Sequence, residues 1–207
     1  MIDIAQEIGA IGRKVAQQAT ASGATVVVTV SRRLAAPVPD VWSALTEPDR
    51  VRRWFLPLTG DLRAGGTYQL EGNASGDVLT CEPPAHLVIT FGGASSVVDL
   101  RLSAEGRQTL LEFDHTVTVE MAGSTAGALY VGPGWDGALM ALSQYLAGSL
   151  AEEPTVAAES PESQAFSAES IDAWTTIVQA SGTTDADAIA TARKAALVQF
   201  APDLKHH

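Results

Sequence analysis

The stretch from Val131 to Leu150 constrains the fold more than any other part of the chain. Its apolar residues recur at intervals of three or four, the spacing of one face of an α-helix. The residues that share this face are Trp135, Leu139, Leu142 and Leu146. Pro133 stands where the first turn of a helix tolerates proline, because its missing N–H would have no partner there. We therefore predict one long helix whose apolar face another layer of structure must cover.

The chain before this helix is rich in strand patterns. Apolar and polar residues alternate, and short turns with Gly, Pro or Asn separate the runs, which is typical of an antiparallel sheet. The predicted strands are Thr25–Leu34, Thr67–Glu71, Asp77–Cys81, His86–Phe91, Ser96–Leu102 and Thr109–Val119. Two short helices, from Pro39 or Asp40 to about Thr46 and from Pro48 to Trp54, are expected after the first of them.

Alternation also predicts which side of each strand faces the long helix. The inward residues are Val26, Val28, Val30, Tyr68, Leu70, Leu87, Ile89, Phe91, Val98, Leu100, Leu102, Leu111, Phe113, His115 and Val117. This set contains no Lys, Arg, Asp or Glu. We expect an apolar interior with few polar groups, suited to an apolar ligand rather than to a charged one.

Two segments outside this unit have apolar stripes of their own. Residues 1–23 are expected to form an amphipathic helix with Ile4, Ile8, Ile11 and Val15 on one face. Residues 24–150 form the main domain, and the Pro/Ser/Glu-rich residues 151–164 a linker. Residues 165–203 are predicted to be a helical hairpin that carries Ile171, Trp174 and Val178. Each stripe must pack on the main domain, on the other segment or on a second copy, so a homodimer is possible.

Composition excludes several classes of function. The chain has 207 residues and a net charge of −11, which opposes nonspecific binding to nucleic acid or to an anionic membrane. Its single cysteine, Cys81, permits no disulfide within the chain and no cysteine cluster for zinc. No signal peptide or membrane-spanning run is present in the sequence, so we expect a cytoplasmic protein. No metal or cofactor is predicted.

Several short motifs occur in the order found in one family of domains. They are Ser31-Arg32-Arg33-Leu34, Ala36-Pro37, Val41-Trp42, Ala44-Leu45-Thr46 with Pro48, Trp54-Phe55, Asp61-Leu62-Arg63 with Gly65-Gly66, Val78 through Pro83, His86-Leu87-Val88, and Gly134-Trp135. Together they resemble the heat-shock protein 90 ATPase activator homologue-like domains of the START-like (SRPBCC, birch-pollen-allergen-like) superfamily. The resemblance covers about residues 25 to 150.

This resemblance implies an α+β helix-grip fold, in which a curved antiparallel sheet wraps around the long C-terminal helix. The superfamily usually has a hydrophobic cavity between sheet and helix. Its members include lipid carriers, hormone receptors, polyketide cyclases and chaperone regulators, so the fold leaves the function open. The family name itself implies a chaperone partner and a role in the stress response.

A set of large apolar side chains, with one histidine and one tyrosine as polar groups, could line a pocket for a planar or apolar ligand. The candidate ligand-binding residues are Trp42, Trp54, Phe55, Tyr68, Phe91, Phe113, His115, Tyr130, Trp135 and Leu139. The same residues would equally suit a filled core. His115 could be an acid or base, but a histidine satisfied by the protein is the commoner case.

Three functions remain open at this stage. The first is noncatalytic binding of a small hydrophobic or aromatic molecule between sheet and helix. The second is a chaperone-regulator-like protein interaction module, and the third is a cyclase- or dehydratase-type enzyme that uses His115. No catalytic set accompanies His115, and the sequence leans away from an enzyme. A basic cluster formed by Arg32, Arg33, Arg50, Arg52 and Arg53 could meet an acidic partner, or could pair with nearby carboxylates.

Overall fold

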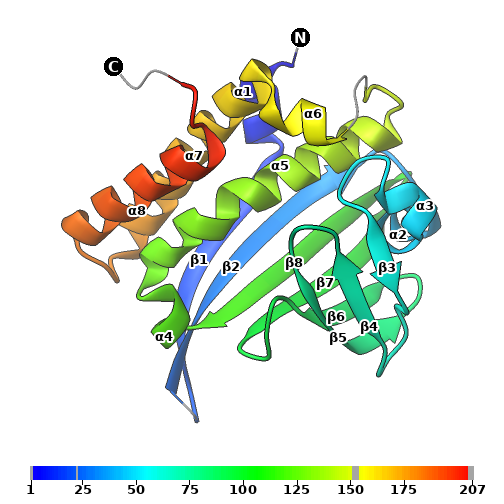
Figure 1. Ribbon diagram of the computed structural model, residues 1–207, viewed down its shortest axis with the longest axis horizontal. Coiled ribbons are helices and arrows are strands. Elements are labelled where there is room, and N and C mark those ends of the chain that lie inside the picture. Colours follow the sequence, from blue (N-terminus) through cyan, green and yellow to red (C-terminus); the bar gives the residue numbers. More distant parts are fainter. Residues whose placement is uncertain (1, 22, 151–153, 205–207) are drawn as a thin grey trace.

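The computed structural model of the protein describes residues 2–21, 23–150 and 154–204, and Figure 1 shows their arrangement. The strands are β1 (Ile11–Thr20), β2 (Gly23–Leu34), β3 (Leu58–Gly60), β4 (Thr67–Leu70), β5 (Ser75–Glu82), β6 (His86–Thr90), β7 (Ser96–Glu105) and β8 (Gln108–Thr118). The helices are α1 (Ile4–Gly9), α2 (Val38–Thr46), α3 (Pro48–Val51), α4 (Val119–Ala122), the 3₁₀ turn η1 (Thr125–Gly127), α5 (Ala128–Leu146), α6 (Pro154–Glu159), α7 (Pro161–Ser181) and α8 (Ala186–Phe200).

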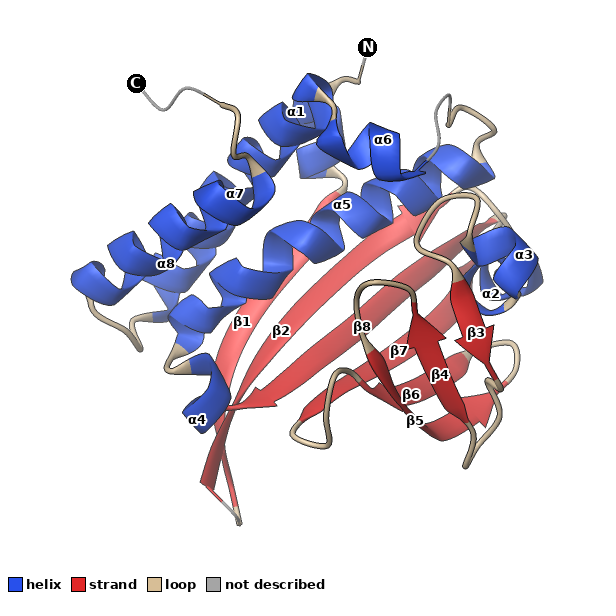
Figure 2. Cartoon of the chain, viewed as in Figure 1, coloured by secondary structure: helices blue, strands red, loops and turns tan. Residues whose placement is uncertain are grey.

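All eight strands form one antiparallel sheet in the order β1-β2-β8-β7-β6-β5-β4-β3. The sheet curves around α5, and α7 and α8 lie on the other side of that helix (Figure 2). This confirms the predicted α+β helix-grip fold. Within the described part of the chain, no helix combines the length and the apolarity needed to cross a bilayer.

The six strands predicted from alternation all form, with ends that shift by a few residues. Their predicted inward faces are also confirmed, since Val28, Leu100 and Leu111 are among the buried core residues. The strand β3, which has only three residues, was not predicted. Short strands give too few alternating positions to be detected.

The prediction of one helix over residues 1–23 is wrong. The helix α1 ends at Gly9, and β1 then pairs with β2 in a register that sets Val15 opposite Val28. Asp3 caps α1, accepting a hydrogen bond from the Gln6 N–H at 3.0 Å. The apolar spacing was ambiguous, because Ile11 and Val15 also share one face of a strand. Pairing with β2 decides the outcome in favour of the strand.

The long helix α5 forms, but it begins and ends earlier than the pattern predicts. It runs from Ala128 to Leu146, so Pro133 lies inside the helix and not in its first turn. A proline there removes one backbone donor from the helix ladder. Pro133 is buried, and the packing around α5 holds the helix together in spite of the missing hydrogen bond.

The prediction that residues 151–164 form a linker is also wrong where the structure describes them. Residues 154–159 form α6, and α7 begins at Pro161 after Ser160, whose side chain accepts a hydrogen bond from the Ser163 N–H. Serine followed by proline is a favourable helix start, and that local signal outweighs the linker-like composition. Residues 151–153 lie outside the described part of the chain.

The predicted C-terminal hairpin is present as α7 and α8, which pack on α5 and, through α7, on α1 and β1. Gly182 ends α7 in the left-handed conformation, and Asp185 caps α8 by accepting from the Ala188 N–H at 2.8 Å. Ile171, Trp174 and Val178 are fully buried. At the other end of the chain Ile11 is buried, while Ile4, Ile8 and Val15 are partly buried against the core of the same molecule. These stripes therefore do not by themselves require a homodimer.

The buried apolar residues form two clusters. The larger cluster joins the inner faces of β2, β7 and β8 to α5 and to the hairpin, and includes Phe113, Leu139 and Trp174. The smaller cluster lies under β3 to β6 and α3, and includes Tyr68 and Leu87. Several of the candidate binding residues lie at the boundary between these two clusters.

Candidate ligand-binding site

Four large apolar side chains contact both core clusters and belong fully to neither. They are Trp42 on α2, Phe55 after α3, Ile89 on β6, and Phe91 directly after β6. All four remain partly exposed although core residues surround them. We call this set the seam. Trp42, Phe55 and Phe91 are among the residues that the sequence analysis selected, and Ile89 was assigned there only to the inward face.

The long helix borders the seam through Trp135. Its ring packs on Phe91, with centroids 5.1 Å apart, and edge-on against Phe113 at 4.8 Å. Leu139, one turn further along the helix, is 3% exposed and belongs to the larger cluster. The structure therefore brings these four predicted residues together, and the space between Phe113 and Trp135 is filled by their own side chains.

Two other predicted residues are core residues rather than lining residues. Trp54 is buried, stacks on Phe55 at 5.3 Å, and donates its indole N–H to the Ala44 carbonyl at 2.9 Å. Tyr68 is buried in the smaller cluster, where its hydroxyl donates to the Thr90 carbonyl at 2.8 Å. Burial raises the pKa of Tyr68 to about 12, so it stays a neutral donor.

Tyr130 does not join the site. It lies on α5, but its side chain is 42% exposed and is absent from both clusters. The predicted helix began at Val131, so Tyr130 was expected just before it. Because α5 begins at Ala128, Tyr130 is part of the first helical turn and faces away from the core.

His115 makes two hydrogen bonds inside the protein. The Trp135 indole N–H donates to its Nδ1 at 3.1 Å, and its Nε2 lies 2.8 Å from the Ser96 hydroxyl. Indole can only donate, so Nδ1 must accept and the proton of the neutral ring sits on Nε2. Nε2 therefore donates to Ser96. The ring is 3% exposed and packs edge-on against Phe91 at 5.6 Å.

Burial lowers the pKa of His115 from 6.5 to about 4. The ring is neutral at physiological pH, and both nitrogens are occupied by Trp135 and Ser96. A general acid or base needs a nitrogen that can reach the substrate. This arrangement argues against the enzyme hypothesis that used His115.

The same pKa predicts a pH dependence of stability. Between pH 6.5 and 4 the unfolded chain binds a proton that folded His115 excludes, so stability falls as the pH falls. The free energy of unfolding should decrease by about 3 kcal/mol over this range because of His115. His115→Gln should remove this part of the acid sensitivity in denaturant titrations, and His86→Gln on the outer sheet face should retain it. Equal acid sensitivity of His115→Gln and wild type would contradict the assignment.

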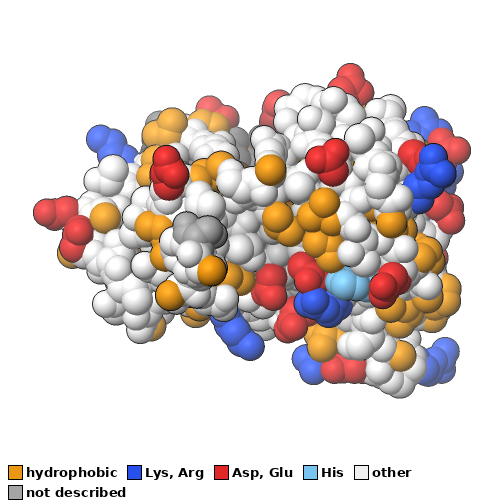
Figure 3. Space-filling view, turned by 90° about the horizontal axis from the view of Figure 1, so that it is seen from below, with side chains coloured by type: hydrophobic (Ala, Val, Ile, Leu, Met, Phe, Trp, Pro, Cys, Tyr) orange, Lys and Arg blue, Asp and Glu red, His pale blue; other side chains and the backbone are white. Residues whose placement is uncertain are grey.

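Three arginines of the candidate basic cluster pair with carboxylates. Arg33 pairs with Glu105 at 2.6 Å, Arg50 with Asp40 at 2.6 Å and Arg52 with Asp49 at 3.1 Å. Figure 3 shows acidic and basic side chains close to one another over one face of the molecule. The arginines thus mostly pair with local carboxylates, the alternative that the sequence left open.

Two arginines are buried on the inner side of the sheet, which corrects the expectation of an interior without charges. Arg32 on β2 pairs with Glu7 at 2.7 Å and donates to the Ser143 hydroxyl at 2.9 Å. Arg13 on β1 pairs with Asp136 on α5 at 2.7 Å. Both pairs lie where α1, the hairpin and α5 meet, not at the seam. The sequence does not reveal them, because the partners are far apart in the chain.

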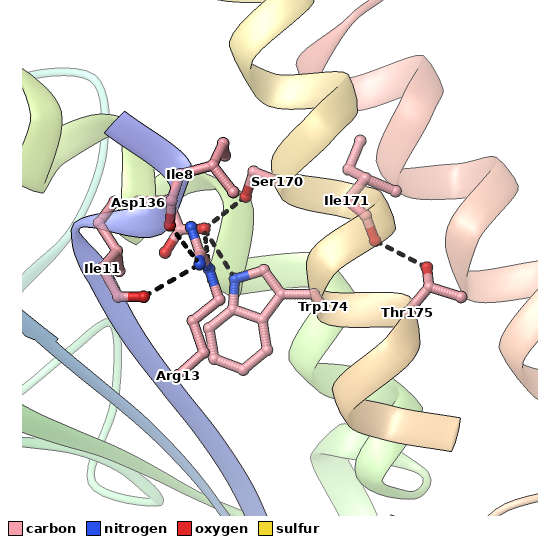
Figure 4. A network of polar contacts seen from close by, with 8 residues as sticks. All are labelled: Ile8, Ile11, Arg13, Asp136, Ser170, Ile171, Trp174 and Thr175. Atoms are coloured by element: carbon pink, nitrogen blue, oxygen red, sulfur yellow. Dashed lines mark hydrogen bonds and ion pairs between the residues drawn. The ribbon is translucent and has the colours of Figure 1, made fainter. Parts of the chain in front are cut away.

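Asp136 connects three parts of the chain (Figure 4). Its Oδ2 accepts hydrogen bonds from the Arg13 Nε, from the Ser170 hydroxyl at 2.5 Å and from the Trp174 indole N–H at 3.0 Å. The Asp136 side chain is fully buried. Asp136 directly follows Trp135, so adjacent residues of α5 hold the seam on one side and the hairpin on the other.

No site for a metal is found in the described chain. Among residues 2–21, 23–150 and 154–204, no group of three or more His, Cys, Asp or Glu side chains could hold a metal ion. Two surface depressions lie away from the seam. One borders Thr67 and Asp77 on β4 and β5, and the other borders Pro37 and Gln108.

Comparisons with solved structures identify several similar proteins. CalU16 from Micromonospora echinospora is 40% identical; its crystal structure has a TM-score of 0.67, with 82% of this chain and 98% of that chain covered. DynU16, titled a putative protein in the dynemicin biosynthetic locus, is 26% identical, with a TM-score of 0.52 over 58% of this chain and 47% of that chain. The Aha1 dimer from Colwellia psychrerythraea, 18% identical over 60% of this chain and 98% of that chain, has a TM-score of 0.50 and shares the fold.

No curated protein matches the sequence significantly. Residues 35–147 match the family described as activator of Hsp90 ATPase homolog 1-like protein. The match spans α2 through the end of α5, so it includes the whole seam together with Trp135 and His115. The helix grip, the order of the motifs and this match agree with one another. The chain belongs to the activator of Hsp90 ATPase homolog 1-like family, within the START-like superfamily.

Proposed function

We propose that this protein binds a small apolar or aromatic molecule, without catalysis, at the seam between its two core clusters. The observation that carries the proposal is the incomplete burial of Trp42, Phe55, Ile89 and Phe91 at the boundary between the two core clusters. A single partly exposed apolar side chain is common in folded proteins, whereas several large ones gathered at one boundary are a candidate binding surface. Partly exposed faces of four such residues offer apolar surface that a ligand could cover.

The filled space between Phe113 and Trp135 limits where the ligand would lie. It would cover the partly exposed faces of the seam and would not enter between these two rings. The seam side chains carry no charge, so an apolar or aromatic molecule suits them best. The helix-grip fold is compatible with a ligand-binding domain, and the description of DynU16 as a protein of a biosynthetic locus accords with a small-molecule ligand.

A titration with the neutral dye N-phenyl-1-naphthylamine tests the proposal. The native protein should bind about one dye molecule with enhanced fluorescence. Ile89→Gln should weaken binding about tenfold, because its amide would be desolvated by the dye without a partner. Val88→Gln is the matched control, since Val88 is the neighbouring residue on the opposite face of β6 and should leave binding unchanged. Absence of saturable binding, or equal losses in both variants, would refute the site.

A protein-interaction module is the second candidate. The direct packing of Trp135 on Phe113 and His115 favours it, because a filled interior is what such a module would have. A chaperone partner agrees with the description of the family. If the native protein fails to bind the dye, this candidate becomes the stronger one. The cytoplasmic location and the homodimer stay predictions, to be checked by fractionation and by light scattering.

A further inference from the structure

A chain of hydrogen bonds at one end of the seam points in a single direction. Trp135 donates to His115 Nδ1, and His115 Nε2 donates to the Ser96 hydroxyl. The direction follows from the indole, which has no lone pair to offer, and from the neutral state of the buried ring. Ser96 Oγ is therefore used as an acceptor, and its own O–H remains available to donate.

The Ser96 hydroxyl has no further partner among the described residues. Ser96 is 4% exposed. A buried hydroxyl that does not donate its proton loses the hydrogen bond it would make in water. The Trp135–His115 and His115–Ser96 hydrogen bonds polarise one another and the Ser96 O–H. Ser96 should therefore be a better hydrogen-bond donor than an isolated serine.

Ser96 lies beside the seam. Its carbonyl accepts the Phe91 N–H at 2.8 Å, and its side-chain partner His115 packs against the Phe91 ring. Trp135, at the start of the hydrogen-bond chain, packs against the same ring at 5.1 Å. A ligand resting on Phe91 would thus lie next to the free donor.

We propose that Ser96 is a specificity-determining residue, and that the ligand is a neutral apolar or aromatic molecule with an oxygen acceptor, such as a ketone or quinone carbonyl, that receives the Ser96 hydrogen bond. This inference rests on the proposed function. The ligand is expected to be neutral, because the side chains around it, Ser96, neutral His115 and Trp135, supply no positive charge. A carboxylate or phosphate would lose its hydration at this position without a counter-charge.

The probes that test the inference are 9-fluorenone and fluorene, which differ only at carbon 9, a carbonyl in the first and a methylene in the second. Their affinities are measured by quenching of tryptophan fluorescence for wild type, Ser96→Ala and Ser103→Ala. Ser103 lies on the exposed face of the same strand and is the matched control. The ratio of the two affinities should shift about three- to tenfold against 9-fluorenone in Ser96→Ala, and should not change in Ser103→Ala.

Infrared spectroscopy of 9-fluorenone bound to the wild type gives a readout that needs no variant. A hydrogen bond from Ser96 should move the carbonyl stretch to a lower frequency than in an alkane solvent. An alkane-like frequency, or an unchanged affinity ratio in folded Ser96→Ala, would overturn the inference while leaving the seam intact. Failure of both probes to bind would overturn the proposed function and this inference with it.

Discussion

Asp136→Ala is expected to lower the free energy of unfolding by about 3–5 kcal/mol, the range for removing one partner of a buried ion pair. The substitution leaves the Arg13 guanidinium buried, with a side chain only 7% exposed, and without its counter-charge. It also removes the acceptor of Ser170 and Trp174, which join the hairpin to α5. Urea denaturation of the purified variants measures the loss.

A surface pair provides the control for this prediction. Asp172 pairs with Arg193 at 2.7 Å, and both side chains are well exposed. Asp172→Ala should therefore cost no more than about 1 kcal/mol. The double replacement Arg13→Met with Asp136→Leu should recover much of the stability lost in Asp136→Ala, because it removes the unpaired charge. A loss below about 1 kcal/mol in Asp136→Ala would show that Arg13 finds another partner or reaches solvent.

Trp174→Ala is expected to destabilise the protein by about 3–5 kcal/mol, the range for truncating a buried large aromatic side chain. Trp174 is fully buried in the larger cluster, and its indole N–H donates to Asp136. Tyr130→Ala, which truncates an aromatic side chain that is 42% exposed, should cost far less. Thermal and chemical denaturation should rank the two variants in this order.

Trp174 on α7 packs directly against Gly132 on α5, which provides a second test. A Cβ at Gly132 would lie 2.5 Å from the Trp174 ring, so Gly132→Ala should destabilise the wild-type protein. In the Trp174→Ala background the ring is absent, and alanine should be neutral or favourable there, since it is a better helix former than glycine. Equal effects of Gly132→Ala in both backgrounds would mean that the two residues are not coupled.

Asp136 and Trp174 hold the hairpin against α5 and do not belong to the seam. The hairpin shares the larger cluster with Phe113 and Leu139, and Trp135 and Asp136 are adjacent on α5. Substitutions in the hairpin should therefore be judged first by their effect on stability. Measurements of dye binding on such variants are meaningful only under conditions where each variant is folded.

The sequence was most informative where one face of an element is buried. Alternation placed Val98, Leu100 and Phe113 on the inner face because a one-residue shift would expose a whole apolar set. The long helix followed from the spacing around Leu139, although its ends did not. Alternation also predicted that His115 faces inward. Its partners Ser96 and Trp135 lie on β7 and α5, and the sequence around His115 does not identify them.

At both ends of the chain, local sequence patterns do not decide between helix, strand and linker. The spacing of Ile11 and Val15 fits a helix and a strand equally, and only pairing with β2 selects the strand. The composition of residues 151–164 resembles a linker, but α7 begins at Pro161 after the Ser160 cap and packs on α5, and α6 packs on α7.

The sequence by itself determined the fold class, the inner faces of the strands and most of the large apolar residues near the seam, because these depend on periodicity along the chain. Only the tertiary structure decided which of those residues stay partly exposed and that His115 is a neutral donor to Ser96. It also decided that Asp136 meets Arg13 across 123 positions of the chain. These features depend on contacts between distant segments, and neither periodicity nor composition records which buried polar groups will become partners.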